Sequence, residues 1–120
     1  MNYINDDLDN PKYIFHGSKE LIESNIEPRQ AASLNGIEDQ CLNAIYGTPI
    51  YEKAVMFAIP KKTIEGMYGH WKCSKDNGTL YNMVIKEDAF GYVYVFDAKD
   101  FNPIESDEYQ YVSLKKIIAN

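Results

Sequence analysis

The chain has 120 residues, ten of them tyrosine, and a formal net charge of −6 at pH 7. A chain of this length forms one domain, with a core large enough to fold without disulfides or a structural metal. Lysine supplies nearly all of the positive charge and Arg29 is the only arginine, which argues against a nucleic-acid partner. The tyrosine content favours a domain rich in strands.

Residues 1–11 are polar and acidic, and we expect them to form a flexible lead-in to a single domain over residues 12–120. The lead-in has neither a basic start nor an apolar centre, so it is not typical of a signal peptide. No apolar run approaches the roughly 20 residues of a membrane span. Cys41 and Cys73 form neither a disulfide framework nor a zinc motif. These features predict a cytoplasmic protein with no membrane partner.

The first part of the domain is predicted to hold a strand and a short helix. Residues 12–16 form an apolar run that indicates a buried strand, and this strand ends at Gly17-Ser18. A helix is predicted over residues 18–23, where a serine can cap an apolar pair. A long polar loop then extends over residues 28–43.

A second strand and a second helix follow. The apolar run at residues 44–46 indicates a strand. Thr48-Pro49 is typical of a helix start, because threonine can cap and proline is tolerated at the first helical position. Ala54 and Phe57 lie three residues apart on the apolar face of this helix. Pro60 ends it.

The second half of the chain contains three candidate strands, at residues 79–85, 92–96 and 108–114. Residues 86–91 are predicted to form the turn of a hairpin between the first two. The whole pattern has strands first, short helices early and strands late. It predicts an α+β domain with two packed, mainly antiparallel sheets and short helices in the N-terminal half.

Three separated patches lie in or at the end of these predicted strands. They are Phe15-His16-Gly17-Ser18, Ala44-Ile45-Tyr46-Gly47-Thr48-Pro49 with the helix after it, and Asp107-Glu108-Tyr109. In this order they resemble the His-Tyr-Glu signature of the ADP-ribosyltransferase fold of diphtheria toxin and the poly-ADP-ribose polymerases. The resemblance covers about half of the chain, in patches.

The resemblance implies the ADP-ribosyltransferase fold and NAD as co-substrate. The family cleaves the bond between nicotinamide and ribose through a transition state with oxocarbenium character, which nearby negative charge stabilises. By this resemblance the catalytic candidates are Glu108, His16 and Tyr46. Glu108 would stabilise the developing cation, with Glu105 as its nearest rival. Tyr46 would stack on the nicotinamide ring, and His16 would hydrogen-bond the adenosine ribose.

The resemblance also implies a set of NAD-binding residues. The backbone of Gly17 would hydrogen-bond the nicotinamide amide, since glycine permits close approach. Phe57 would form the other side of a ring sandwich. Ser18 and Thr48 belong to the same candidate set. Arg29 lies in the segment where some members bring an arginine to the adenine side.

Several of these residues also have a structural interpretation. A histidine after an apolar strand is commonly a hydrogen-bonded structural residue, and Tyr46 within an apolar run is commonly part of the core. Thr48 suits a helix cap. Glu108 alternates with Tyr109, so one of the two points inward.

The sequence therefore predicts an NAD-binding protein that transfers one ADP-ribose to an unidentified protein or small-molecule acceptor, or that hydrolyses NAD. One alternative is a non-catalytic ligand-binding or protein-interaction module that keeps the same fold, which the short stretch between the second and third patches favours. Another is a β-rich interaction domain that matches the patches by accident. His70 and Cys73 have metal-like spacing without a second pair, so no metal site is predicted.

Overall fold

The computed structural model describes residues 3–19, 21, 25–26, 29–30, 43–73, 78–105, 109–114 and 117–118. Over this part the chain is a small mixed α+β domain, which confirms the predicted class. It has one α-helix, α1 (Tyr51–Ala58), and a 3-10 helix, η2 (Ala98–Asp100), among the described residues. Neither of these two helices of the described part has the length and apolarity needed to cross a membrane.

The strands of the described part pair in small antiparallel sheets. β1 pairs with β9, β10-β11-β4-β3 form a four-stranded sheet, and β12–β2, β5–β8 and β6–β7 form two-stranded sheets. In chain order the strands are β1 (Tyr13–Ser18), β2 (Asn25–Ile26), β3 (Arg29–Gln30), β4 (Asn43–Gly47), β5 (Lys61–Thr63), β6 (His70–Cys73), β7 (Gly78–Tyr81), β8 (Met83–Ile85), β9 (Tyr92–Asp97), β10 (Asn102–Pro103), β11 (Tyr111–Ser113) and β12 (Ile117–Ile118).

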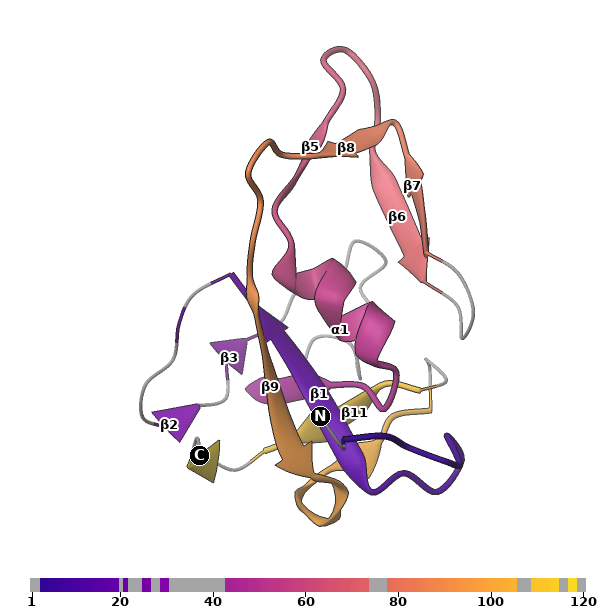
Figure 1. Ribbon diagram of the computed structural model, residues 1–120, viewed down its shortest axis with the longest axis vertical. Coiled ribbons are helices and arrows are strands. Elements are labelled where there is room, and N and C mark those ends of the chain that lie inside the picture. Colours follow the sequence, from indigo (N-terminus) through magenta and orange to yellow (C-terminus); the bar gives the residue numbers. More distant parts are fainter. Residues whose placement is uncertain are drawn as a thin grey trace.

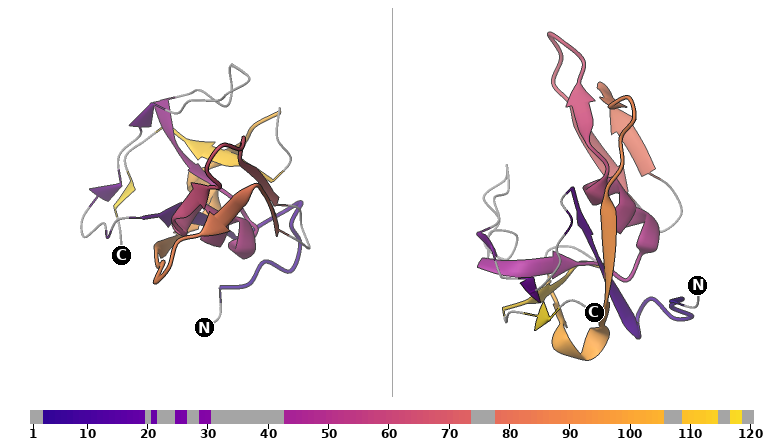
Figure 2. Two further views of the ribbon diagram at one scale, coloured as in Figure 1. Left: turned by 90° about the horizontal axis from the view of Figure 1, so that it is seen from above. Right: turned by 60° about the vertical axis from the view of Figure 1, so that its left-hand side comes forward.

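The molecule consists of a body and a projecting arm (Figure 1). The body contains the β1–β9 ribbon, the four-stranded sheet and α1. The arm is formed by β5, β6, β7 and β8, and it extends away from the body beyond α1 in the right-hand view of Figure 2. Because β6 pairs with β7 and β5 pairs with β8, the arm is one nested ribbon that runs out from the body and returns to it.

The core lies where β1, β4 and β9 meet. Two backbone hydrogen bonds join β1 to the end of β4: Phe15 N donates to Thr48 O at 2.8 Å, and Thr48 N donates to Phe15 O at 2.9 Å. A Cβ atom on Gly47 would lie 2.4 Å from Ile14 Cγ2, so only glycine allows the two strands to pack this closely. The buried apolar cluster at this junction contains Ile14, Ile45, Phe96 and Phe101.

Two sequence predictions in the second half need correction. The strand predicted over residues 79–85 is broken at Asn82, whose φ of 56° separates β7 from β8. The hairpin predicted between residues 79–85 and 92–96 does not form, because β8 pairs back with β5 while β9 pairs with β1. Burial explains the exchange of partners: β9 carries the buried Phe96 into the core, whereas Val84 and Ile85 of β8 stay exposed.

The helix predicted over residues 18–23 is described only at residues 18, 19 and 21, and none of these three is helical. The second predicted helix forms as α1 and ends at Ala58, two residues before Pro60. The third predicted strand forms over its last part, as β11 (Tyr111–Ser113).

Asn5 ties the lead-in to the body. Its Nδ2 donates to Tyr13 O and to Pro49 O, both at 2.9 Å. Its Oδ1 accepts from Lys12 N and Tyr13 N, also at 2.9 Å. One amide side chain thus binds the start of β1 and the segment that precedes α1, through two hydrogen bonds from Nδ2 and two to Oδ1.

Asn5→Ala should lower the free energy of unfolding by about 2 kcal/mol, because it removes three half-buried hydrogen bonds and one exposed hydrogen bond at once. Asn10→Ala is the matched control, since Asn10 lies in the same segment with an exposed side chain. Urea unfolding followed by circular dichroism measures both variants. An Asn5→Ala value equal to that of the control would contradict the anchoring role.

Candidate functional site

A cavity of about 80 Å³ lies between β1, the end of β4, and α1. Five residues that the sequence analysis assigned to a binding site line it: His16, Gly17, Tyr46, Thr48 and Phe57. They come from the first two patches, which lie about thirty residues apart in the chain. The structure therefore brings these two patches together, and it does so through the hydrogen bonds between Phe15 and Thr48.

A third hydrogen bond fixes the imidazole of His16 at the cavity. Its Nδ1 lies 2.7 Å from the backbone oxygen of Tyr46. A carbonyl oxygen can only accept, so Nδ1 carries the hydrogen, and in the neutral ring Nε2 is then an acceptor. The ring is half-buried and lies 6.4 Å from the ring of Tyr94 on β9. His16 thus makes the structural hydrogen bond that is common for a histidine after an apolar strand, and this bond to Tyr46 O also fixes the orientation of the imidazole.

Gly17 is where α1 lies directly on β1. A Cβ atom at this position would be 2.0 Å from the backbone oxygen of Ala54, so any larger residue would push the helix away. This contact is a structural reason for glycine at position 17, and it does not depend on a ligand. It also fixes the distance between β1 and α1, and therefore the width of the cavity.

Thr48 is buried, with 2 % of its surface exposed, and its Oγ1 accepts from Ile50 N at 3.1 Å. The N-cap residue of α1 is Ile50, which makes no side-chain cap hydrogen bond. The interpretation of Thr48 as the helix cap is therefore wrong by two residues. Its hydroxyl instead closes the turn that leads from β4 into α1.

Phe57 forms the side of the cavity that faces the arm. Its ring is 46 % exposed and meets the ring of Trp71 on β6 edge to face, at 4.8 Å between centroids. The ammonium of Lys61 lies 5.1 Å from the centroid of the Trp71 ring. The same ammonium donates to Met56 O and to Ile59 O at the C-terminal end of α1. The base of the arm thus supports the Phe57 wall.

Of the five lining residues that were not assigned to the site from the sequence, two have polar side chains. Lys53 on α1 is charged but only 8 % exposed, and Gln110 follows the third patch and is half-buried. The spacing from Lys53 to Phe57, four residues on one helix, places both on the same face and was the available signal. Gln110 had no comparable signal, because the chain turns just before it at Tyr109, where φ is 63°.

Lys53 and Glu52 both act on the thiol of Cys73, which forms no disulfide and is partly buried on β6. Burial raises the pKa of the Cys73 thiol, the Lys53 ammonium lowers it, and the Glu52 carboxylate raises it. Lys53 thus lines the cavity and also acts electrostatically on the Cys73 thiol at the base of the arm.

Three further site residues were predicted, and the structure describes the side chain of one of them, Ser18. Ser18 is on β1 opposite Tyr92 and does not line the cavity. Arg29 pairs through its backbone with Ala44, and nothing is described of its side chain. Glu108 lies outside the described residues, so its position relative to His16 is not part of this geometry. Its rival Glu105 is exposed.

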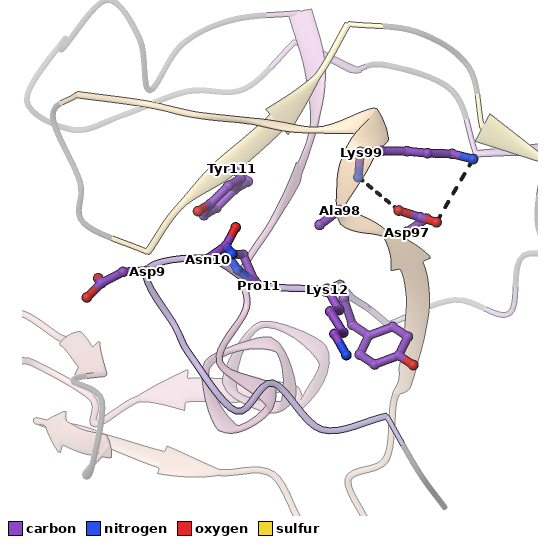
Figure 3. Close-up of a pocket in the computed structure, with 9 residues that line it drawn as sticks. Asp9, Asn10, Pro11, Lys12, Asp97, Ala98, Lys99 and Tyr111 are labelled. Carbon is purple, nitrogen blue, oxygen red and sulfur yellow. Dashed lines mark hydrogen bonds and ion pairs between the residues drawn. The ribbon is translucent and has the colours of Figure 1, made fainter.

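A second, more open cavity of about 610 Å³ lies between the lead-in, the end of β9 and β11 (Figure 3). Figure 3 shows Tyr111 facing Asn10, with Lys99 and Asp97 paired at the opposite side. The Lys99–Asp97 pair is 4.0 Å apart and exposed, which makes it a weak contact. Burial, and then Asp9, raise the pKa of Tyr111. None of the assigned site residues that the structure describes lines this second cavity, so the smaller cavity is the better candidate.

No group of three potential metal ligands occurs among the described residues. His70 instead stacks on Tyr81, with ring centroids 4.4 Å apart, and Cys73 pairs with Gly78 across the β6–β7 ribbon. Comparison of the chain with protein-family models, with curated proteins and with solved structures finds no match in any of the three.

The position of Lys53 can be tested through Cys73. In a Cys41→Ser background, Lys53→Met should raise the pKa of the Cys73 thiol further, because a positive charge that stabilises the thiolate is lost. Glu52→Gln should lower it for the opposite reason. The measurement is the pH dependence of alkylation by iodoacetamide, with Lys62→Met as the control. Equal profiles for Lys53→Met and Lys62→Met would contradict the placement of the Lys53 ammonium.

Proposed function

We propose that this protein binds NAD at the cavity between β1, β4 and α1 and acts as an ADP-ribosyltransferase, or as an NAD hydrolase where water is the acceptor. One observation carries the proposal. The residues that the resemblance selected from two distant patches, His16, Gly17, Tyr46 and Phe57, all line a single cavity. A chance match in sequence gives no reason for such residues to meet.

The chemistry of the cavity supports the binding of a flat ring with polar edges. Tyr46, Phe57 and the buried Phe15 supply aromatic surface, and His16, Lys53 and Gln110 are polar residues of the lining. In the proposed reaction the bond between C1′ of the ribose and the nicotinamide nitrogen breaks, and its electron pair leaves with nicotinamide. A bond from C1′ to the acceptor oxygen or nitrogen forms, and the acceptor releases one proton. Glu108 is proposed to stabilise the positive charge that develops on the sugar.

The size of the cavity limits which part of the ligand it holds. At about 80 Å³ it is below the roughly 300 Å³ at which small-molecule sites begin, so most of a dinucleotide would lie outside it. The same observation favours the second candidate function, a non-catalytic module that binds a small group or a protein. Where such a module binds NAD or nicotinamide, the two functions differ in whether nicotinamide is released from NAD.

Binding is tested first. Trp71 is the only tryptophan and its ring contacts Phe57, so its fluorescence should change when nicotinamide or NAD enters the cavity. Phe57→Leu should weaken binding by about tenfold, because the cavity loses one of its aromatic rings. The fold should stay intact, since Phe57 is about half exposed and is not part of the core. Tyr68→Leu is the control, since Tyr68 is exposed on the arm. Calorimetry with both ligands confirms the constants. The proposal would be overturned if neither nicotinamide nor NAD bound.

Turnover is tested next, by chromatographic detection of nicotinamide released from NAD. Glu108→Gln should lower the rate by about 100-fold or more while leaving NAD binding intact, as expected for the loss of one group that acts on the transition state. Glu105→Gln is the matched control three residues away. Full activity in Glu108→Gln would remove Glu108 from the catalytic role, and binding without any release would favour the non-catalytic module.

A further inference from the structure

The cavity between β1, β4 and α1 is lined by a buried cation that the resemblance did not select. Lys53 belongs to the lining and has only 8 % of its surface exposed. No acidic side chain occurs among the described residues of the lining, although the chain has 18 acidic and 12 basic residues. The neighbouring Glu52 is exposed and does not line the cavity. The described lining therefore carries a net positive charge within an acidic protein.

The helix α1 determines on which side of the cavity this charge lies. Lys53 and Phe57 are four residues apart on α1 and share one face of it. On this face the ring of Phe57 meets the ring of Trp71 on β6. The Lys53 ammonium also lowers the pKa of the Cys73 thiol on β6, which places its charge on the same side. A ligand ring that packs against Phe57 thus lies beside a cation.

A cation beside the ring changes which ring the cavity accepts. The pyridine ring of NAD bears a positive charge on its nitrogen while it is bonded to ribose, and its amide is neutral. A buried ammonium repels this ring more strongly than an ammonium in water does, because the effective dielectric constant is lower. A carboxylate in place of the amide makes the ring neutral overall and gives the ammonium an acceptor. The charge of Lys53 therefore favours a ring carboxylate over a ring amide.

We propose that the cavity recognises a pyridine carboxylate through Lys53, so that the preferred substrate is the acid analogue of NAD, in which a carboxylate replaces the amide, and NAD is the weaker one. The inference rests on the proposed function, because it places the pyridine ring in the same cavity, against Tyr46 and Phe57. It departs from the resemblance, which implies an amide bonded to the backbone of Gly17. That glycine already has a structural reason in its contact with Ala54.

The same contact assists the proposed reaction. When the bond between C1′ and the ring nitrogen breaks, its electron pair goes to the nitrogen, and the ring with its carboxylate changes from a zwitterion to an anion. The positive charge on the sugar is consumed when the acceptor bonds to C1′ and releases one proton. The attraction between the ring and Lys53 therefore grows along the reaction. An interaction that is stronger in the transition state than in the bound substrate accelerates the step.

The binding test compares nicotinate with nicotinamide, two ligands of the same shape, by calorimetry at pH 8. An ordinary imidazole is neutral at this pH, so the positive charge among the described lining residues is that of Lys53. The native chain should bind nicotinate at least about tenfold more tightly than nicotinamide, as expected for one charge-assisted hydrogen bond. Lys53→Met should bind the two ligands equally, because methionine fills the space without a charge. Lys62→Met, which changes an exposed lysine of the arm, is the matched control and should keep the native preference.

The turnover test measures the ring that is released from NAD and from its acid analogue, by chromatography. In the native chain kcat/KM should be at least about tenfold higher for the acid analogue, because the contact with Lys53 is retained and strengthened in the transition state. Lys53→Met should remove this difference, and Lys62→Met should keep it.

The inference would be overturned if nicotinamide bound the native chain as tightly as nicotinate, or if Lys53→Met kept the native preference. If circular dichroism shows that Lys53→Met does not fold, benzoate and benzamide decide in the native chain: a preference for benzoate is expected, and equal affinities overturn the inference. Equal binding of both pyridines with release of nicotinamide from NAD would remove the inference and leave the proposed function. A preference for nicotinate without cleavage of either dinucleotide would support the recognition by Lys53 and remove the transferase function. Binding of neither pyridine would remove both.

Discussion

The junction between β1 and the end of β4 determines the rest of this structure. Three hydrogen bonds form it: two between the backbones of Phe15 and Thr48, and one from the imidazole of His16 to the backbone oxygen of Tyr46. Main-chain bonds at a buried junction are costly to break, because their donors and acceptors would be left without partners. The junction places a histidine and a tyrosine from remote parts of the chain on one cavity. Its neighbour Ile14 carries the same strand into the apolar core.

Helix α1 is positioned by the absence of side chains beneath it. Gly17 lets the backbone of Ala54 lie directly on β1, and Gly91 does the same for the backbone of Ala58 at the approach to β9. The C-terminal end of the helix is in turn held by Lys61, whose ammonium donates to two carbonyl oxygens there. Burial and the nearby Lys19 lower the pKa of that ammonium, so the contact is made by a cation in a site that disfavours its charge. Cavity, helix and arm are therefore one connected unit.

Much of the local structure could be predicted from the sequence, whereas the partners of each strand could not. The apolar run at β1, the strand–helix junction at Thr48-Pro49 and the run at β9 each have a local pattern, and each forms an element close to its predicted bounds. The pairing of β9 with β1 depends on the packing of Phe96 in the core, which is a contact between distant parts of the chain that no local sequence pattern predicts. For the site, Lys53 had a helical-spacing signal beside Phe57, and Gln110 had none. The role of Glu108 in the third patch remains a prediction, because Glu108 lies outside the described residues.

The most direct test of the β1–β4 junction is the protonation of His16, measured by ¹⁵N–¹H correlation spectra of the imidazole nitrogens at a pH where the ring is neutral. The chain has two histidines, so His70→Gln assigns the signals. We expect His16 to be held as a single tautomer with the hydrogen on Nδ1, because the backbone oxygen of Tyr46 can only accept. A hydrogen on Nε2, or two tautomers in rapid exchange, would contradict the junction and with it the assembly of the cavity.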